Sequence, residues 1–256
     1  MKSPHILLLT GMLTLFTSVA FAGKSQSAAN NAAAPGFALV ELYTSEGCSS
    51  CPPADRLVAR IQAAYQGKEV YILAYHVDYW NRLGWKDVFS SPQYSQRQNN
   101  YAGYLHLNEV YTPQVIVNGR TGFVGSDESK MQSALQQNLS KYPTATLSFT
   151  GFKQENKKVT LQYHISGSLN NSSLYLAVVQ KHAQTVVKAG ENSGHTLTHI
   201  NIVNKLESIS LKNSSGIAGI NLPEGYNPRD WSIIGFVQNN RSGEILAVQK
   251  AMAENI

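Results

Sequence analysis

An α/β domain with a helical insertion, followed by a smaller all-β, sandwich-like domain, is the fold that this sequence predicts. Two observations lead to it. Apolar, β-branched runs alternate with helical patterns over residues 36–143, whereas short β-rich runs fill residues 144–256. The chain has 256 residues, 43% of them hydrophobic, which is enough for one large or two small domains that each bury a core.

In the first half, apolar strands alternate with helical segments. Pro52 and Pro53 open the first helix, because proline fits the first turn, where the backbone N–H has no intrahelical partner. Ser126 is expected to cap the last helix, with Asp127 and Glu128 in its positive first turn. The elements are expected in the order strand 37–43, helix after Pro53, strand 69–77, helix 91–105, strand 113–119, strand through Val124 and helix 127–141.

In the second half, short β-rich runs are separated by Gly, Asn and Ser, a spacing typical of a small sandwich or barrel. They occupy residues 146–152, 159–166, 174–180, 185–189, 231–238 and 245–250. His195 and His199, four residues apart, suit a metal pair, but no third ligand lies nearby in the sequence. The alternative is that His199 docks its loop against the first half of the chain.

The first 22 residues are predicted to be a secretory signal peptide. Lys2 supplies a positive start, residues 6–15 form an apolar core, and Ala-Phe-Ala at 20–22 is a small-x-small cleavage signal. Residues 23–35, rich in Gly, Ser, Ala and Asn, are predicted to be a flexible leader. We therefore expect an exported protein, periplasmic or secreted, that is soluble after cleavage and has no membrane span.

The composition argues against nucleic-acid binding. Only 14% of the residues are charged, and the formal net charge of +5 comes from 21 Lys and Arg against 16 Asp and Glu. Nucleic-acid binding requires a basic patch, whereas the basic residues of this chain are scattered singly, and their densest cluster spans only residues 153–158. We expect no nucleic-acid partner.

Cys48 and Cys51 are the only cysteines of the chain. In an oxidising compartment a single pair is expected to form a disulfide. The pair directly precedes the first predicted helix, so both cysteines lie at a helix N-terminus. Zinc sites also contain Cys-x-x-Cys, but a structural zinc ion normally takes four protein ligands, and the chain has no second pair. We predict no metal site and no cofactor.

Four segments point to a known family. They are VELYTSEGCSSCPPAD at residues 40–55, HVDYW at 76–80, VYTPQ at 110–114 and GENSGHTLTH at 190–199. In these segments the chain resembles a bacterial family of secreted thioredoxin-like proteins, catalogued as domain of unknown function 1223. The resemblance implies a thioredoxin-like domain over residues 36–143, with residues 144–256 as a β-rich C-terminal domain. It also implies that Pro113 is cis and packs against the disulfide.

The predicted chemistry is thiol–disulfide exchange with protein substrates. A thiolate attacks a disulfide, and the positive end of a helix stabilises a thiolate on Cys48. Cys48 is expected to be the more exposed, attacking cysteine, Cys51 to be the resolving cysteine, and Pro113 to shape the substrate groove. The expected partners are protein thiols or disulfides and a redox partner of unassigned identity. The alternative is an inert disulfide that closes a four-residue loop.

Four further residues are candidates for a supporting role. Thr112 precedes the expected cis proline. Glu41 lies seven residues before Cys48 in an apolar strand, where thioredoxin-like reductases carry a buried acid that moves the proton of the inner thiol. The alternatives are that Glu41 faces solvent or pairs with a nearby base. His76 and Asp78 share one face of a strand end, where they either assist proton transfer or form a capping hydrogen-bond pair.

The segment from His76 to Leu105 is longer than a minimal thioredoxin connection and is rich in aromatic residues. Its rings either form a recognition surface beside Cys48 or fill the core of a helical subdomain. The leading functional hypothesis is an exported thiol–disulfide oxidoreductase that acts on envelope or secreted proteins. One alternative is an envelope binding protein with a structural disulfide. Another is a periplasmic metal-handling protein that uses the dithiol with His76.

Overall fold

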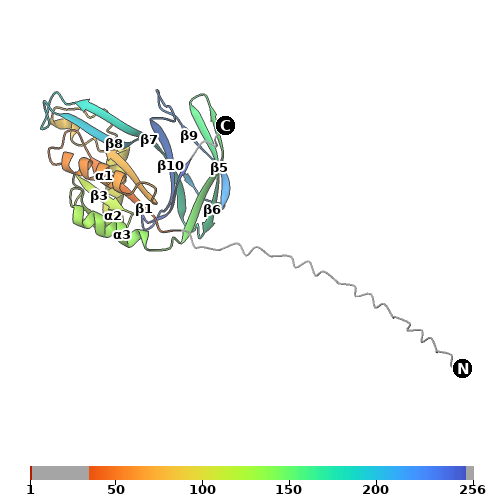
Figure 1. The fold of residues 1–256 in the computed structure, drawn as a ribbon. Coiled ribbons are helices and arrows are strands. Elements are labelled where there is room, and N and C mark those ends of the chain that lie inside the picture. The colour runs from red at the N-terminus through yellow and green to blue at the C-terminus, as the bar shows by residue number, and fades with distance from the viewer. Residues whose placement is uncertain (2–34, 252–256) are drawn as a thin grey trace. The chain divides into compact units, whose positions relative to one another are not determined.

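The computed structural model describes Met1 and residues 35–251 (Figure 1). The rest of the predicted signal peptide and residues 23–34 of the predicted leader lie outside the described residues. Within the described part of the chain, none of the helices has both the length and the hydropathy that crossing a membrane requires.

One mixed sheet of eight strands contains strands from both halves of the chain (Figure 1). Its order is β11-β10-β7-β8-β2-β1-β3-β4. The first half contributes β1 (Ala38–Thr44), β2 (Val70–His76), β3 (Gln114–Val117) and β4 (Thr121–Val124). The second half contributes β7 (Ser172–Val186), β8 (Thr196–Ser210), β10 (Trp231–Asn239) and β11 (Ile245–Ala251). The strands β1 and β2 are parallel, and β2 pairs in parallel with β8 at Ala74 and Ile202.

The described residues contain three α-helices and one 3-10 turn. They are α1 (Pro52–Ala64), the turn η1 (Asn81–Leu83), α2 (Pro92–Tyr104) and α3 (Glu128–Leu139). The helices α1 and α3 pack against the sheet face that carries Val40 and Leu42 of β1. The helix α2 packs against the opposite face, which carries Leu39 and Tyr43. The sheet is therefore covered by helices on both faces in the first half of the chain.

The helix starts follow their local sequence. Ser91 caps α2 as predicted, since its side chain accepts a hydrogen bond from the backbone N–H of Gln93. At α3 the cap is Asp127, whose carboxylate accepts a hydrogen bond from the backbone N–H of Lys130. The prediction that Ser126 caps this helix was wrong by one residue. Both residue types make good caps, so neighbouring positions are hard to distinguish from sequence.

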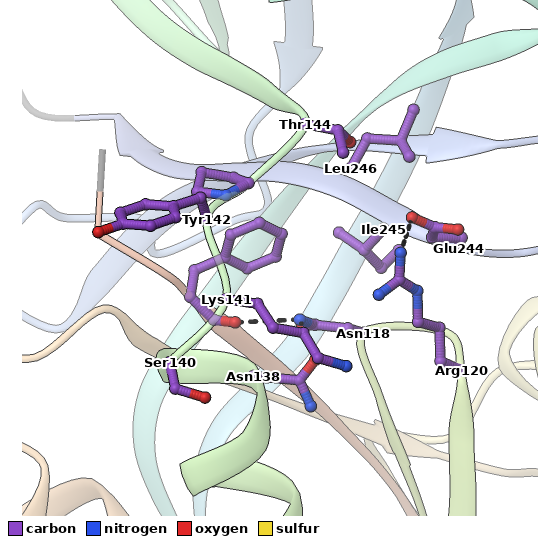
Figure 2. Close-up of a pocket in the computed structure, with 12 residues that line it drawn as sticks. Asn118, Arg120, Asn138, Ser140, Lys141, Tyr142, Thr144, Glu244, Ile245 and Leu246 are labelled. Carbon is purple, nitrogen blue, oxygen red and sulfur yellow. Dashed lines mark hydrogen bonds and ion pairs between the residues drawn. The ribbon is translucent and has the colours of Figure 1, made fainter. Parts of the chain in front are cut away.

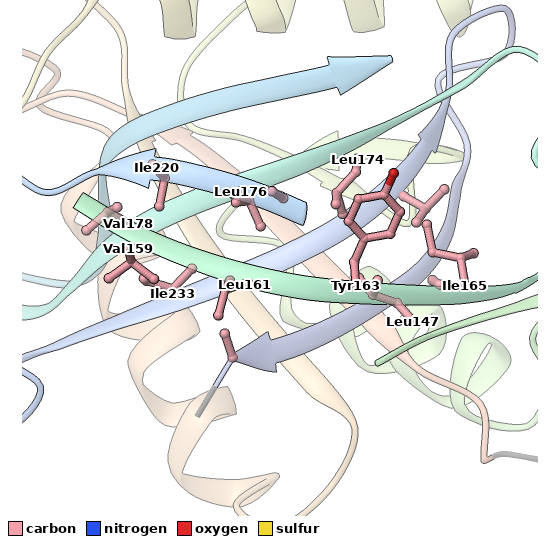
Figure 3. Close-up of a cluster of buried hydrophobic side chains, with 14 of the residues drawn as sticks. Leu147, Val159, Leu161, Tyr163, Ile165, Leu174, Leu176, Val178, Ile220 and Ile233 are labelled. Atoms are coloured by element: carbon pink, nitrogen blue, oxygen red, sulfur yellow. The ribbon is translucent and has the colours of Figure 1, made fainter. Parts of the chain in front are cut away.

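A second, three-stranded sheet packs on the main sheet through an apolar cluster (Figure 3). Its order is β5-β6-β9, with β5 (Ala145–Glu155), β6 (Lys158–Gly167) and β9 (Ser215–Asn221). Alternate residues of β6, such as Leu161 and Ile165, are buried against Leu176 of β7 and Ile233 of β10. This alternation is expected of a sheet with one buried face.

The predicted fold class was wrong. A thioredoxin-like α/β domain with a helical insertion and a separate sandwich-like domain would keep the strands of the two halves in different sheets. Instead, β8 lies beside β2, and the segment between β2 and β3 holds only one α-helix, α2. Of the residues that the structure describes, 44% are in strands and 19% in helices. The reason lies in strands such as β10, which is buried on both faces and therefore lies inside the larger sheet.

Candidate functional site

Cys48 and Cys51 form the expected disulfide, at the start of α1, with their Cα atoms 5.4 Å apart. Cys51 is the N-cap residue, and its carbonyl oxygen accepts hydrogen bonds from the backbone N–H groups of Ala54 and Asp55. The positive end of the helix dipole is therefore next to the pair. Both cysteines are 0% exposed, so Cys48 is not the more exposed of the two in this disulfide-bonded state.

Ser50 connects the disulfide to the loop before β3. Its Oγ lies 3.4 Å from the Sγ of Cys48 and donates a hydrogen bond to the carbonyl oxygen of Thr112 at 3.5 Å. The peptide bond between Thr112 and Pro113 is cis. The indole Nε1 of Trp80 donates to the Thr112 hydroxyl at 2.7 Å. The structure therefore brings the predicted residues Cys48, Thr112 and Pro113 to one place.

The loop between β7 and β8 holds the disulfide segment from the other side. The Nδ2 of Asn192 donates to the carbonyl oxygens of Glu46 and Cys48, at 2.8 and 3.0 Å. The backbone N–H of Ser49 donates to the carboxylate of Glu191 at 3.0 Å. Sequence reasoning did not select Glu191 or Asn192 as site residues. Their signal was present, because both belong to the segment at 190–199 that supports the family resemblance.

Three carboxylates and two histidines form a buried acid–base cluster beside the disulfide segment. Its members are Glu46, Asp55, His76, Asp87 and His199, none more than 7% exposed. The Nδ1 of His76 lies 2.7 Å from Oδ2 of Asp87. The Nδ1 of His199 lies 3.4 Å from Oδ1 of Asp55, and its Nε2 lies 3.6 Å from Oε1 of Glu46. The two imidazole rings are 4.7 Å apart, between centroids.

The main sheet brings this cluster together. His76 ends β2, and His199 lies on β8, the strand that pairs with β2. Glu46 lies two residues before Cys48, in the loop after β1, and Asp55 belongs to the first turn of α1. Each of these elements therefore contributes one ionisable side chain to the buried cluster. The prediction that His199 connects the two halves agrees with these contacts.

His199 is the cationic centre of the acid–base cluster. Burial lowers the pKa of its imidazole, but the neighbouring carboxylates of Asp55 and Glu46 outweigh burial and raise this pKa from 6.5 to about 9. Burial also raises the pKa of the Asp87 carboxyl, yet the charge and hydrogen bond of His76, with backbone N–H groups, leave it below its usual value. His199 is therefore protonated at neutral pH.

A cavity of about 140 Å³ lies beside the acid–base cluster. Pro52, Asp55 and Arg56 of α1 line it, together with residues 196–199 of β8. Two members of the cluster, Asp55 and His199, therefore border a space large enough to hold water.

A larger cavity, of about 450 Å³, is lined by none of the predicted site residues (Figure 2). Its lining includes Asn118, Lys141 and Arg120, and the Arg120 guanidinium is paired with the carboxylate of Glu244 (Figure 2). Neither cysteine and no member of the acid–base cluster faces it, so the disulfide stays the candidate site.

The structure does not bring Glu41 or Asp78 to the disulfide. Glu41 points to the α2 face of the sheet, where its carboxylate forms an ion pair with Arg97 at 2.6 Å and accepts a hydrogen bond from Tyr101. This is the arrangement in which Glu41 pairs with a nearby base. Asp78 accepts a hydrogen bond from the hydroxyl of Ser95 in α2. His76 is the supporting candidate that lies in the acid–base cluster.

The aromatic residues of the predicted insertion divide between core and site. Tyr75, Tyr94 and Tyr101 are fully buried between the sheet and α2. Trp80 and Trp85 are half-buried beside the disulfide segment, where Trp85 donates a hydrogen bond from Nε1 to Glu46. The tyrosines thus fill a core between the sheet and α2, and Trp80 and Trp85 are the rings that lie near Cys48.

Within residues 35–251 no group of three or more His, Cys, Asp or Glu side chains has the geometry to hold a metal ion. His195 is exposed and His199 is buried, so the two histidines do not face one another as a metal pair.

Comparison with known proteins places this geometry in a family context. The model of the family described as "Protein of unknown function (DUF1223)" matches residues 39–238. The crystal structure of protein AGR_C_4864 from Agrobacterium tumefaciens is 26% identical, with a TM-score of 0.66, and the match covers 88% of this chain and 100% of that chain. HBP35 of Porphyromonas gingivalis is 14% identical, with a TM-score of 0.60, over 87% of this chain and 79% of that chain. The likeness to HBP35 concerns the fold alone. None of the curated proteins matches this sequence.

Proposed function

The chain belongs to the DUF1223 family of proteins of unknown function, and we propose that it is an exported thiol–disulfide oxidoreductase whose redox pair is Cys48 and Cys51. Its substrates are envelope or secreted proteins that carry thiols or disulfides. The predicted signal peptide supports export. The disulfide at the N-terminus of α1 is the observation that carries the proposed chemistry.

The position of the disulfide favours exchange over a structural role. Backbone N–H groups and the positive end of a helix stabilise a thiolate, which is the form that attacks and leaves in exchange. A disulfide that closes a four-residue loop stabilises the folded chain by about 2 kcal/mol in the chain-entropy model, against about 3 kcal/mol for a loop of 15 residues. The pair therefore stabilises the folded chain by about 1 kcal/mol less than a disulfide across a 15-residue loop would.

Access to Cys48 depends on the loop between β7 and β8. In the oxidised state Cys48 is fully buried, and Asn192 holds its carbonyl oxygen. Ser49 and Ser50, between the cysteines, are exposed, so a substrate chain meets the disulfide segment there first. Movement of the loop away from Ser49 and Cys48 opens the sulfur to attack. Loops with few buried apolar contacts open at low free-energy cost.

The proposed reaction exchanges one disulfide for another. A substrate thiolate attacks the Sγ of Cys48, a mixed disulfide forms, and the bond between Cys48 and Cys51 breaks. Cys51 leaves with the electron pair. A second thiolate of the substrate then attacks the substrate sulfur of the mixed disulfide and releases Cys48. The substrate dithiol is oxidised to a disulfide, the protein disulfide is reduced to a dithiol, and the two substrate thiols give up two protons.

A second candidate function is an envelope binding protein with a structural disulfide. The complete burial of both cysteines is the observation that favours it, since exposed thiols react faster than buried ones. In that case the half-buried Trp80 and Trp85 and the exposed Leu83 between them would contact the partner. The two candidates differ in whether Cys48 exchanges with an external thiol.

Trapping with the Cys51→Ala variant separates the two functions. We expect Cys48 to form a mixed disulfide with oxidised glutathione, and this bond to persist because no resolving thiol is left. Mass spectrometry of the intact protein measures the adduct. The Cys48→Ala variant is the matched control, and it should react at least tenfold more slowly, because Cys51 is fixed as the N-cap residue of α1, whereas Cys48 lies in the loop before the helix.

Two further outcomes of the trapping experiment are informative. Adding Asn192→Ala to the Cys51→Ala variant should speed adduct formation, because the carbonyl of Cys48 loses its hydrogen bond to the loop. If neither single-cysteine variant forms an adduct while both remain folded, the oxidoreductase proposal is wrong, and the binding function is favoured.

A further inference from the structure

We propose that Asp55 and His199 act together to exchange a proton with the sulfur of Cys51 in each redox cycle. The inference rests on the proposed function and deepens it. It assigns a role in the chemistry to β8, a strand from the half of the chain that contains no cysteine.

The helix places Asp55 next to Cys51. The backbone N–H of Asp55 donates to the carbonyl oxygen of Cys51 at 3.1 Å, which is the bond of one helical turn. Side chains four residues apart on a helix are neighbours, with about 5–6 Å between their Cβ atoms. Both side chains are buried, Cys51 at 0% and Asp55 at 7% exposure. The carboxylate of Asp55 is therefore the ionisable group that the helix itself brings to Cys51.

His199 extends this contact into the acid–base cluster. Its Nδ1 faces Asp55, and its Nε2 faces Glu46. Within the described residues, His199 Nε2 and Glu46 Oε1 are buried without a hydrogen-bond partner. A buried polar atom without a partner is costly, so its persistence in a folded protein calls for a role. Here Nε2 faces Glu46 without a hydrogen bond, and Nδ1, which faces Asp55, is the nitrogen that exchanges the proton.

All charged groups around His199 lie on four other segments. Glu46 comes from the loop after β1, Asp55 from α1, His76 from β2, and Asp87 from the loop before α2. The carboxylates of Glu46 and Asp55 face the two nitrogens of His199, whereas Asp87 is paired with His76. Two carboxylates, those of Glu46 and Asp55, thus favour the protonated form of His199, and the third, that of Asp87, contacts His76 instead.

The cavity of about 140 Å³ gives the pair a route to solvent. Asp55 and His199 both line it, and the exposed residues Arg56 and Thr198 form part of its lining. Water in this cavity can return a proton to His199 after each cycle. The cysteines are absent from the lining. Within the proposal, a proton from this cavity therefore reaches Cys51 through Asp55 and His199.

The proton step fits the exchange reaction. When a substrate thiolate attacks Cys48, the bond to Cys51 breaks and Cys51 leaves as a thiolate with the electron pair. The His199 imidazolium then gives its proton to this thiolate through Asp55, so that no extra negative charge remains in the buried cluster. Water restores the proton on His199. In the reverse direction, neutral His199 accepts the proton of Cys51 before the thiolate attacks the mixed disulfide.

The test measures the second-order rate constant for reduction of the disulfide by dithiothreitol at a series of pH values. Each rate constant is divided by the fraction of dithiothreitol that is present as thiolate. In the wild-type protein this rate constant should be constant near neutral pH and should fall as pH rises through the pKa of His199, where the proton donor is lost. His199→Gln should reduce the rate constant at pH 7 at least tenfold and remove the fall. Asp55→Asn should likewise reduce the rate constant at pH 7 at least tenfold, because an amide cannot pass the proton from His199 to the sulfur of Cys51.

The control is His195→Gln, which changes an exposed histidine of the same hairpin and should keep the wild-type profile. If His199→Gln does not fold, the rate constant of Asp55→Asn at pH 7 decides the question. If the wild-type protein is reduced and both His199→Gln and Asp55→Asn show its rates and pH profile, the proton role is wrong. That result would leave the oxidoreductase function intact. Failure of the folded wild-type protein to be reduced at all would overturn both.

Discussion

Replacing Arg97 by Met is expected to lower the free energy of unfolding by about 3–5 kcal/mol, because a buried carboxylate is left without its cation. The Nε and Nη2 atoms of Arg97 donate to the two carboxylate oxygens of Glu41, at 2.6 and 3.0 Å. The side chain of Glu41 is 0% exposed, so water cannot take the place of the guanidinium. The guanidinium also lies within 5.6 Å of four aromatic ring centroids, those of Tyr75, Tyr101, Tyr175 and Phe236.

Urea unfolding curves measure this difference, and Arg60→Met is the matched control. Arg60 forms an ion pair with Glu128, but both side chains are more than half exposed. Exposed ion pairs contribute about 0–1 kcal/mol, so the control should be close to the wild-type protein. Equal stabilities of the Arg97 and Arg60 variants would mean that the Glu41 pair is not the buried contact described above.

Raising the pH from 6 to above 9 is expected to remove about 3 kcal/mol of stability through His199 alone. The pKa of this imidazole is about 9 in the folded protein, against 6.5 for an unperturbed histidine. A raised pKa means that the folded state binds the proton more tightly. The contribution is therefore fully present below pH 6.5 and is lost as the pH rises through 9.

Urea unfolding at a series of pH values isolates this contribution when wild type and His199→Gln are compared. The stability of the wild-type protein should fall across the window from pH 6.5 to 9, and that of His199→Gln should fall less. His195→Gln should follow the wild-type curve, since this side chain is exposed and lies outside the cluster. Parallel curves for wild type and His199→Gln would contradict a protonated, buried His199.

The sequence predicted the local elements of the first half well. Apolar runs at 37–43 and 69–77 correspond to β1 and β2, and the prolines after Cys51 correspond to the start of α1. These features depend on short-range patterns, which one sequence contains. The meeting of the cysteine pair with Thr112 and Pro113 was expected only from the family resemblance.

The assembly of the two halves could not be predicted in the same way. A run such as residues 231–238 has apolar side chains at five of its eight positions, on both faces of a strand. This pattern indicates a strand buried on both faces but not the sheet to which it belongs. For the same reason the contact between Asp55 and His199, 144 residues apart, was not foreseen. The sequence left three roles open for Glu41, because its partner Arg97 lies on a helix 56 residues later.

The reduction potential of the Cys48–Cys51 pair tests the account most directly. Equilibration of the folded protein with glutathione redox buffers, followed by alkylation and mass spectrometry, measures it. A redox-active pair should have a potential between about −270 and −120 mV, the range of known Cys-x-x-Cys oxidoreductases. A potential below about −300 mV would identify a structural disulfide and contradict the proposed function.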